Sequence, residues 1–204
     1  MKLFYAPGAC SMATHIALQE SGLGFVPIKV DLAGKTTGDG RDYGLINPKG
    51  YVPTLQFANG QHLTEVIAIL SYVADQVPTS RLIAEAGTME RYRALEMLGY
   101  IATELHKSFS PLFSPDATDD TRQAALAHIG RRLQYVENEL AEKTFLMGNA
   151  FTVADCYLFT VLGWTDMLKM DLTDKPNLQG YQRRIASRPA VQKVLEAEGL
   201  TQGV

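Results

Sequence analysis

The chain lacks the patterns that define several protein classes. It has only two cysteines in 204 residues, too few for the disulfide framework of a small secreted protein. It has no uninterrupted apolar run of about 18 residues, the length that a membrane-spanning helix needs. The first apolar stretch is broken by Pro7 and Gly8, which does not match a signal peptide. These absences predict a cytoplasmic protein with reduced cysteines and no membrane partner.

Positive charge is also scarce. The 19 lysines and arginines are outnumbered by 22 aspartates and glutamates, which gives a net charge of −3. A nucleic-acid partner normally requires a concentrated basic face, so we expect none. The histidines show no ligand spacing with cysteines or acids, so we also expect no metal site. The four histidines are His15, His62, His106 and His128.

The first part of the chain mixes strand and helix signals. An Asn59-Gly60 pair between two apolar runs predicts a hairpin. A strand followed by a helix and a second strand precedes this hairpin, and a helix follows it. This order predicts an α/β domain with a mixed four-stranded sheet, in the thioredoxin-like βαβ-ββα arrangement. The expected strands are 2–5, 25–30, 52–57 and 62–63, and the expected helices are 12–21 and 65–75.

The remainder of the chain reads as an all-helical bundle. Thr88 predicts the start of a long helix with an apolar stripe at helical spacing, ended by Pro111 and Pro115. Thr152 and Asp155 form a capping box before a helix that is apolar nearly all round. The stripe comprises Met89, Tyr92, Leu95, Leu98, Ile101 and Leu105. We therefore predict two domains, 1–78 and 87–204, with a linker at 79–86.

Cys10 is the strongest candidate for a reactive residue. It follows the first strand and a Pro-Gly turn and lies where the first helix begins. Unpaired N–H groups and the helix dipole favour an anion there, which lowers a cysteine pKa and populates the thiolate. The alternative is a buried cysteine that acts as a small hydrophobe. We expect Cys156, inside an apolar helical run, to be of that second kind.

Several short sequences, together with this two-part order, resemble those of the cytosolic glutathione transferases. A cysteine at position 10 and His106 within Glu104-Leu-His-Lys107 resemble the bacterial beta class. The resemblance covers essentially the whole chain and implies a homodimer that binds glutathione and a small hydrophobic electrophile. The matching sequences are KLFYAPGACS from Lys2, INPKGYVPTL from Ile46, LTE from Leu63 and FTVAD from Phe151.

The resemblance also implies a role for each matching residue. Cys10 and His106 would be catalytic, next to the sulfur. Glu65 would bind the γ-glutamyl amino group, and the Val66 N–H would bind its carboxylate. A cis Val52–Pro53 bond would present the Val52 backbone to the peptide, and Lys35 would bind the glycyl carboxylate. Further expected glutathione contacts are Tyr5, Ser11, Tyr51, Gly99, Thr103 and Glu104. Among these, Ser11 is a possible second donor to the sulfur, and we favour a packing role for Tyr5.

The second substrate would bind between the two domains. The candidate residues are Tyr100, Phe109, Leu112, Phe113 and Trp164. By type these are ordinary core residues, and the sequence does not show which of them line the site.

Three functions remain open at this point. Cys10 would stabilise the glutathione thiolate for conjugation, as in a glutathione S-transferase. Alternatively it would form a mixed disulfide with glutathione, as in a thiol-disulfide oxidoreductase, a peroxidase or a reductive dehalogenase. A glutaredoxin-type dithiol is excluded because the position three residues on is Ala13. A non-catalytic ligand-binding protein of the same fold is the third reading.

Overall fold

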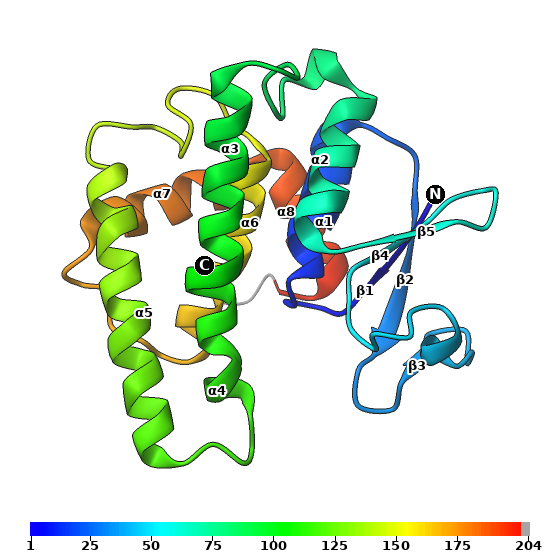
Figure 1. Cartoon of the computed structure of the whole chain (residues 1–204), viewed down its shortest axis with the longest axis horizontal. Coiled ribbons are helices and arrows are strands. Elements are labelled where there is room, and N and C mark those ends of the chain that lie inside the picture. Colours follow the sequence, from blue (N-terminus) through cyan, green and yellow to red (C-terminus); the bar gives the residue numbers. More distant parts are fainter. Residues whose placement is uncertain (201–204) are drawn as a thin grey trace.

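The computed structural model describes residues 1–200 and contains a sheet-bearing half and a helical half that lie side by side (Figure 1). The strands are β1 (Lys2–Tyr5), β2 (Val26–Asp31), β3 (Thr36–Thr37), β4 (Thr54–Gln56) and β5 (His62–Thr64). They form one sheet in the order β3-β2-β1-β4-β5. Strand β2 is parallel to β1, and the other neighbouring pairs are antiparallel. The thioredoxin-like order is therefore confirmed.

The sheet has five strands rather than the expected four. The additional strand, β3, is only two residues long and lies between the expected strands 25–30 and 52–57. Two residues are too few to leave a periodic pattern in a sequence. Because β3 pairs only with Val30 and Asp31 at the end of β2, Pro27 lies beyond its reach on the outer side of the sheet. This position tolerates a residue without a backbone N–H.

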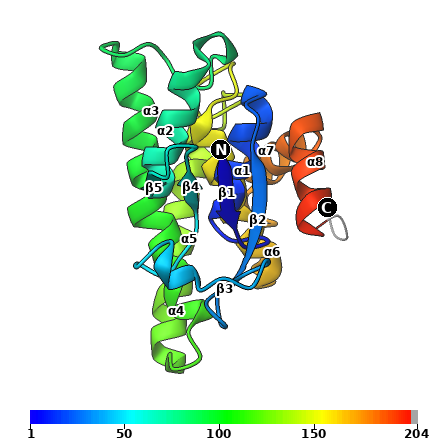
Figure 2. The same cartoon turned by 90° about the vertical axis from the view of Figure 1, so that its right-hand side faces the viewer.

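The two faces of the sheet are covered by different elements. Helices α1 (Ser11–Ser21) and α2 (Val66–Gln76) lie between the sheet and the helical half (Figure 1). Leu3 and Tyr5 of β1 belong to the large core that includes these helices, whereas Phe4 faces the opposite way. Phe4 packs there against Tyr43 of the short helix η1 (Tyr43–Leu45). The period-two alternation of a strand thus divides β1 between two cores. Figure 2 views the molecule from the side of the sheet.

The helical half is built around one buried helix, α6 (Val153–Met167). Twelve of its residues are buried, which matches its nearly continuous apolar sequence. The capping box of Thr152 and Asp155 that starts this helix is present as predicted. The surrounding helices are η2 (Pro78–Ser80), α3 (Met89–Tyr100), α4 (Ser110–Phe113), α5 (Asp119–Glu139), α7 (Pro176–Ala186) and α8 (Pro189–Glu198).

The expected long helix from Thr88 changes character before it reaches Pro111. After α3 the chain forms a π-helical turn, η3 (Ile101–Leu105), and then a 3₁₀ turn, η4 (His106–Phe109). The predicted apolar stripe is correct in its second half but wrong in its first turn. Met89 and Tyr92 are 65% and 57% exposed, because the first turn of α3 projects beyond the core. Within residues 1–200, no helix has the length and apolarity needed to cross a membrane.

Candidate active site

Cys10 lies at the junction of β1 and α1, as the sequence predicted. It is the residue that precedes the first turn of α1, and its side chain does not cap that helix. Instead, its Sγ donates a hydrogen bond to the carbonyl oxygen of Val52 at 3.2 Å. The Val52–Pro53 peptide bond is cis, as expected. The thiol therefore lies directly beside the backbone that leads into β4.

The environment of Cys10 favours the thiol and not the thiolate. Burial raises its pKa to about 12, and the negative charge of Glu65 acts in the same direction. The backbone N–H groups of Cys10 and Ser11, together with Lys107, lower the pKa but do not offset the burial. Our expectation of a populated thiolate is therefore wrong for this structure, because desolvation outweighs the helix terminus.

The loop that carries Cys10 is held by hydrogen bonds from distant segments. The Gly8 carbonyl accepts from Nε1 of Trp164 at 2.8 Å, and the Gly8 N–H donates to Glu198 at 2.9 Å. Within the loop, the Ser11 hydroxyl accepts from the Ala6 N–H and donates to the Ala6 carbonyl. Its single proton is thus used by the turn, which gives Ser11 a structural contact in place of a donor to the sulfur.

Tyr5 lies in the core near this loop. It is 8% exposed, and its ring centroid is 5.4 Å from that of His15 on α1. Burial raises the pKa of its phenol, and Glu198 adds to that shift. These contacts agree with the packing role that we favoured for Tyr5.

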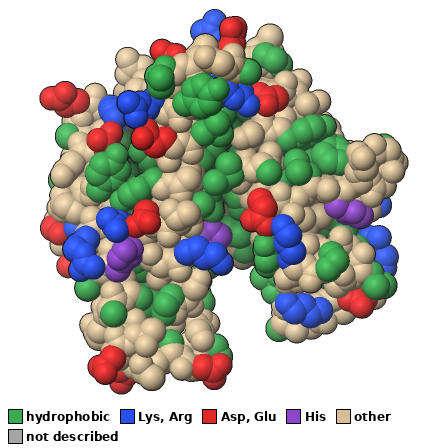
Figure 3. Space-filling view, viewed as in Figure 1, with side chains coloured by type: hydrophobic (Ala, Val, Ile, Leu, Met, Phe, Trp, Pro, Cys, Tyr) green, Lys and Arg blue, Asp and Glu red, His purple; other side chains and the backbone are tan. Residues whose placement is uncertain are grey.

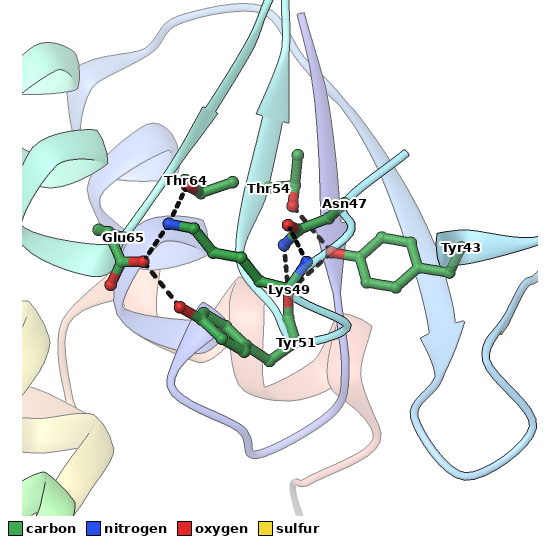
Figure 4. A network of polar contacts seen from close by, with 7 residues as sticks. All are labelled: Tyr43, Asn47, Lys49, Tyr51, Thr54, Thr64 and Glu65. Carbon is green, nitrogen blue, oxygen red and sulfur yellow. Dashed lines mark hydrogen bonds and ion pairs between the residues drawn. The ribbon is translucent and has the colours of Figure 1, made fainter. Parts of the chain in front are cut away.

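A second group of polar residues lies on loops of the same half. Glu65 precedes α2 with a φ of +70°, a conformation that L-residues rarely adopt. Its Oε1 accepts from Lys49 Nζ at 2.5 Å and from the Tyr51 hydroxyl at 2.8 Å (Figure 4). These two hydrogen bonds lower the pKa of the Glu65 carboxyl. A carboxylate is thereby oriented at the start of a helix, beside Val66.

The remaining expected contacts of that group are also close in space. Lys35 Nζ donates to the Gly50 carbonyl at 2.9 Å, which brings this lysine to the loop that precedes Val52. The Tyr43 hydroxyl and the Asn47 amide both donate to the Tyr51 carbonyl, as Figure 4 shows. Lys49 was not among the predicted site residues, because a loop lysine is usually solvated.

His106 comes from the helical half and faces Cys10 across a cavity. It directly follows the π-helical turn, which changes the direction of the side chains after it. Its Nδ1 lies 2.6 Å from the Tyr157 hydroxyl, and its ring centroid lies 4.9 Å from that of Trp164. Burial lowers the pKa of His106 to about 4, and Lys107 acts in the same direction. The imidazole is therefore neutral at pH 7.

The cavity between the halves has a volume of about 340 Å³ and a mostly apolar lining. Figure 3 shows the surface hollowed between the lower ends of the two halves. The cavity brings together both catalytic candidates, Cys10 and His106, and two of the electrophile candidates, Phe113 and Trp164. Its other lining residues were not predicted, because each comes from an ordinary loop or helix position. They are Ala6, Pro7, Gly8, Ala9, Leu32, Ser110 and Met167.

Three electrophile candidates do not line this cavity. Phe109 is 1% exposed and packs behind it against Phe113 and Trp164. Leu112 packs against the main core at the edge of α4. Tyr100 donates its hydroxyl to the Arg132 carbonyl of α5 and lines a different groove, between α3 and α5. The residue type alone did not show which candidates line the cavity and which lie elsewhere, because all three are apolar or aromatic.

Gly99, Thr103 and Glu104 lie outside the cavity lining as well. The Thr103 hydroxyl donates to the Gly99 carbonyl at 3.1 Å. Glu104 forms an ion pair with Arg132 of α5 at 2.8 Å. We had expected both residues among the glutathione contacts. Within the chain, their side-chain contacts lie along η3, α3 and α5, on another face of the helix.

The second cysteine, Cys156, lies apart from the cavity. Cys156 is fully buried, as predicted, and both cysteines are free. Among residues 1–200, no group of three or more histidine, cysteine, aspartate or glutamate residues is arranged to hold a metal ion. The cavity lining itself supplies a thiol, from Cys10, and a neutral imidazole, from His106.

Comparisons with known proteins agree with this arrangement. Residues 8–76 match the family model "Glutathione S-transferase, N-terminal domain", and residues 100–189 match "Glutathione S-transferase, C-terminal domain". The chain is 47% identical to glutathione S-transferase GstA of Escherichia coli O157:H7 over 200 residues, which cover 98% of this chain and 100% of the relative.

Two solved structures extend the comparison to three dimensions. A sphingomonad glutathione S-transferase in complex with glutathione has a TM-score of 0.95 and 46% identity, over 98% of this chain and 100% of its own. A beta-class glutathione S-transferase of Sphingomonas chungbukensis has the same TM-score, identity and coverage. By its sequence over nearly its whole length and by its fold, this chain belongs to the glutathione S-transferase family.

Proposed function

We propose that this glutathione S-transferase conjugates glutathione to small hydrophobic electrophiles, with Cys10 beside the reacting sulfur. The observation that carries the proposal is the position of Cys10. Its thiol touches the Val52 carbonyl on one side and lines the apolar cavity on the other. A peptide that pairs with the Val52 backbone would therefore place its own thiol next to Cys10 and the cavity.

The polar residues of the amino-terminal half fit the charged ends of such a peptide. Glu65 offers a carboxylate to the γ-glutamyl ammonium group, and the first N–H groups of α2, from Val66 on, suit its carboxylate. Lys35, held beside Gly50, suits the glycyl carboxylate. Tyr51 and Lys49 keep Glu65 in place through their hydrogen bonds. Tyr5 packs in the core near the loop that carries Cys10, and Ser11 supports that loop through its hydrogen bonds to Ala6.

The proposed reaction is a nucleophilic substitution by the glutathione thiolate. The sulfur forms a bond to the electrophilic carbon, the leaving group departs with its electron pair, and the thiol proton passes to solvent. Because the Cys10 pKa is raised to about 12, Cys10 keeps its proton, and it would turn this proton from the Val52 carbonyl to the neighbouring sulfur anion as a hydrogen-bond donor. The neutral His106 would face the same anion, and Phe113 and Trp164 would form the wall for the electrophile.

A redox function is the second candidate, and the position of Cys10 in the cavity is the observation that favours it. In that case the Cys10 thiolate would attack oxidised glutathione, form a mixed disulfide and release one reduced glutathione. The raised pKa of Cys10 disfavours this route, because the thiolate is the attacking species.

One experiment separates the two functions. Purified protein is assayed for conjugation with chlorodinitrobenzene and for reduction of a glutathione mixed disulfide, next to Cys10→Ser, Cys10→Ala and, as a control, Cys156→Ala. The donor role predicts that Cys10→Ser keeps most of the conjugation that Cys10→Ala loses. The redox role predicts that both Cys10 variants lose reductase activity completely. Wild-type protein that neither binds glutathione nor turns over any electrophile would contradict the proposal.

We further propose that the chain acts as a cytoplasmic homodimer of two-domain subunits, divided at 1–78 and 87–204 with 79–86 as linker. Exposed Tyr92 and Tyr135 on α3 and α5 support this assembly. In such a dimer, Gly99, Thr103 and Glu104 would contribute to the glutathione site of the neighbouring subunit. Light scattering on the purified chain tests the assembly, and a monomer mass would contradict it.

A further inference from the structure

Tyr157 places a buried hydroxyl group next to the imidazole of His106. Tyr157 lies on the buried helix α6 and is 2% exposed. Its hydroxyl has one hydrogen-bond partner among residues 1–200, Nδ1 of His106, at 2.6 Å. The cavity lining includes His106 but not Tyr157. Tyr157 therefore acts on the cavity only through the imidazole.

This contact determines which nitrogen of His106 carries the proton. A neutral imidazole has one N–H donor and one bare acceptor nitrogen. If Nδ1 carried the proton, it would donate to the Tyr157 oxygen, and the phenol proton would then have no acceptor. Buried polar hydrogens are seldom left without a partner. If the phenol donates to a bare Nδ1, both groups are satisfied and the imidazole proton is on Nε2.

The protonation states of both groups agree with this assignment. Burial lowers the pKa of His106 to about 4, so the ring is neutral at pH 7. Burial also raises the pKa of the Tyr157 phenol, and Cys10 and Glu65 add to that shift. The pair therefore holds one phenol proton and one imidazole proton, as the hydrogen-bond argument requires.

Neighbouring aromatic rings fix the orientation of the imidazole. The His106 ring meets Trp164 edge to face at 4.9 Å and 70°. It meets the Tyr157 ring at 5.9 Å and 87°. With Nδ1 directed to Tyr157 and the ring held against Trp164, Nε2 is the nitrogen left for the cavity that Cys10 also lines.

We propose that Tyr157 is a positioning residue that holds His106 in the Nε2–H tautomer, so that a neutral N–H donor faces the sulfur in the cavity. The tautomer follows from the contacts above, whereas the role toward sulfur rests on the proposed function. A neutral donor stabilises a sulfur anion without a titration near pH 7. The opposite tautomer would direct a nitrogen lone pair at that anion and repel it.

The tautomer is tested directly by long-range ¹H–¹⁵N spectra of histidine-labelled protein between pH 6 and 8. The His106 signals are assigned by their absence from a His106→Gln variant. We expect wild-type His106 to show a protonated Nε2 and a bare Nδ1 across this range. A protonated Nδ1, or an imidazolium at pH 7, would overturn the proposal. This test uses the wild-type protein and needs no turnover.

The role toward sulfur is tested with Tyr157→Phe, which removes only the hydroxyl. We expect the His106 signals to shift toward the other tautomer and kcat/KM for conjugation to fall about tenfold, which equals about 1.4 kcal/mol. The KM for glutathione should change less than twofold. The matched control is Tyr181→Phe, which removes another buried hydroxyl, one that donates to Asp155 at 2.9 Å. It should leave the His106 signals and kcat unchanged.

The outcomes separate this proposal from the proposed function. An unchanged kcat in Tyr157→Phe, with a shifted tautomer, would overturn the role toward sulfur. An unchanged tautomer in that variant would overturn the positioning role. If wild-type protein has no conjugating activity, the proposed function and the sulfur role fail, while the spectra still decide the tautomer. If Tyr157→Phe does not fold, the wild-type spectra remain decisive for the tautomer, and conjugation by His106→Gln at the wild-type rate overturns the sulfur role.

Discussion

The two halves of the molecule contribute to the active site in opposite ways. The amino-terminal half presents polar side chains on loops, and the side chains of Lys49 and Glu65 are 45% and 55% exposed. The helical half presents His106, which Tyr157 holds from within the core. It also holds the Gly8 loop of the other half through Trp164. The polar side chains of the amino-terminal half are thus open to solvent, whereas those of the helical half are held in the core.

An exposed polar cluster and a buried one differ in energy and in adaptability. Exposed ion pairs contribute about 0–1 kcal/mol to stability, and they remain available to a charged ligand. A buried polar group must be fully hydrogen-bonded, and the loss of one partner is costly. We therefore expect changes in the amino-terminal cluster to alter binding with little effect on folding. Changes in the helical half should alter folding and orientation.

The largest expected effect is that of Asp155→Ala. The Asp155 carboxylate accepts from the N–H groups of Leu146 and Thr152 and from the Tyr181 hydroxyl, all within 3.0 Å. Removal of this acceptor leaves several buried donors unsatisfied and should lower the free energy of unfolding by about 3–5 kcal/mol. Urea unfolding followed by tryptophan fluorescence measures it.

The matched control for that variant is Asp166→Ala on the same helix. Asp166 accepts from Gln182 at the exposed end of α6, so its loss should cost less than about 1 kcal/mol. Equal destabilisation by the two variants would remove the contrast between buried and exposed contacts.

The second effect is a pH dependence of stability that His106 causes. Its pKa falls from 6.5 to about 4 on folding, so the unfolded chain binds more protons between these values. Stability is therefore lost as the pH falls through this window, by about 2 kcal/mol between pH 7 and pH 5. In His106→Gln this component should be absent from urea unfolding curves, whereas His62→Gln on β5 should keep it. Identical pH slopes in wild type and His106→Gln would contradict the buried, neutral imidazole.

The third effect belongs to the amino-terminal cluster. Glu65→Gln should raise the KM for glutathione about tenfold. The hydrogen bond that we propose between residue 65 and the γ-glutamyl ammonium group would lose the negative charge of its acceptor. The free energy of unfolding should change by less than about 1 kcal/mol, because the side chain is exposed. Steady-state kinetics and urea unfolding measure the two quantities, with Glu139→Gln as the control. A loss of stability without a change in KM would reverse the proposed division between the halves.

The smallest effect is that of Tyr51→Phe. This change removes one of the two hydrogen bonds that hold the Glu65 carboxylate and should raise the KM for glutathione about two- to threefold. Since Tyr51 acts through Glu65, the double variant with Glu65→Gln should have the same KM as Glu65→Gln alone. Additive effects in this double-mutant cycle would show that Tyr51 contacts the ligand independently.

The residues predicted best from the sequence were those that act through local backbone chemistry. The strand, turn and helix start around Cys10, the capping box at Asp155 and the Asn59-Gly60 turn all depend on neighbours within a few positions. Local rules also predicted a helix start at Glu65, one residue before α2 begins. Such features form in any fold that contains the same helices and strands.

The residues predicted worst were those whose role depends on what packs against them. Phe109, Phe113 and Trp164 have the same character in the sequence, yet only the last two line the cavity. The two-residue strand β3 and the π-helical turn before His106 left no periodic signal. Tyr157 was not predicted because its partner is 51 positions away.

The sequence by itself determined the two-part order of elements and the place of Cys10 at a helix start, and it pointed to the polar residues that we propose for a charged peptide. Only the tertiary structure decided that Cys10 remains a thiol, that His106 is neutral and which aromatic rings form the cavity wall. The physical reason is that helix and strand formation depends on short-range sequence, whereas desolvation depends on segments brought together from the whole chain.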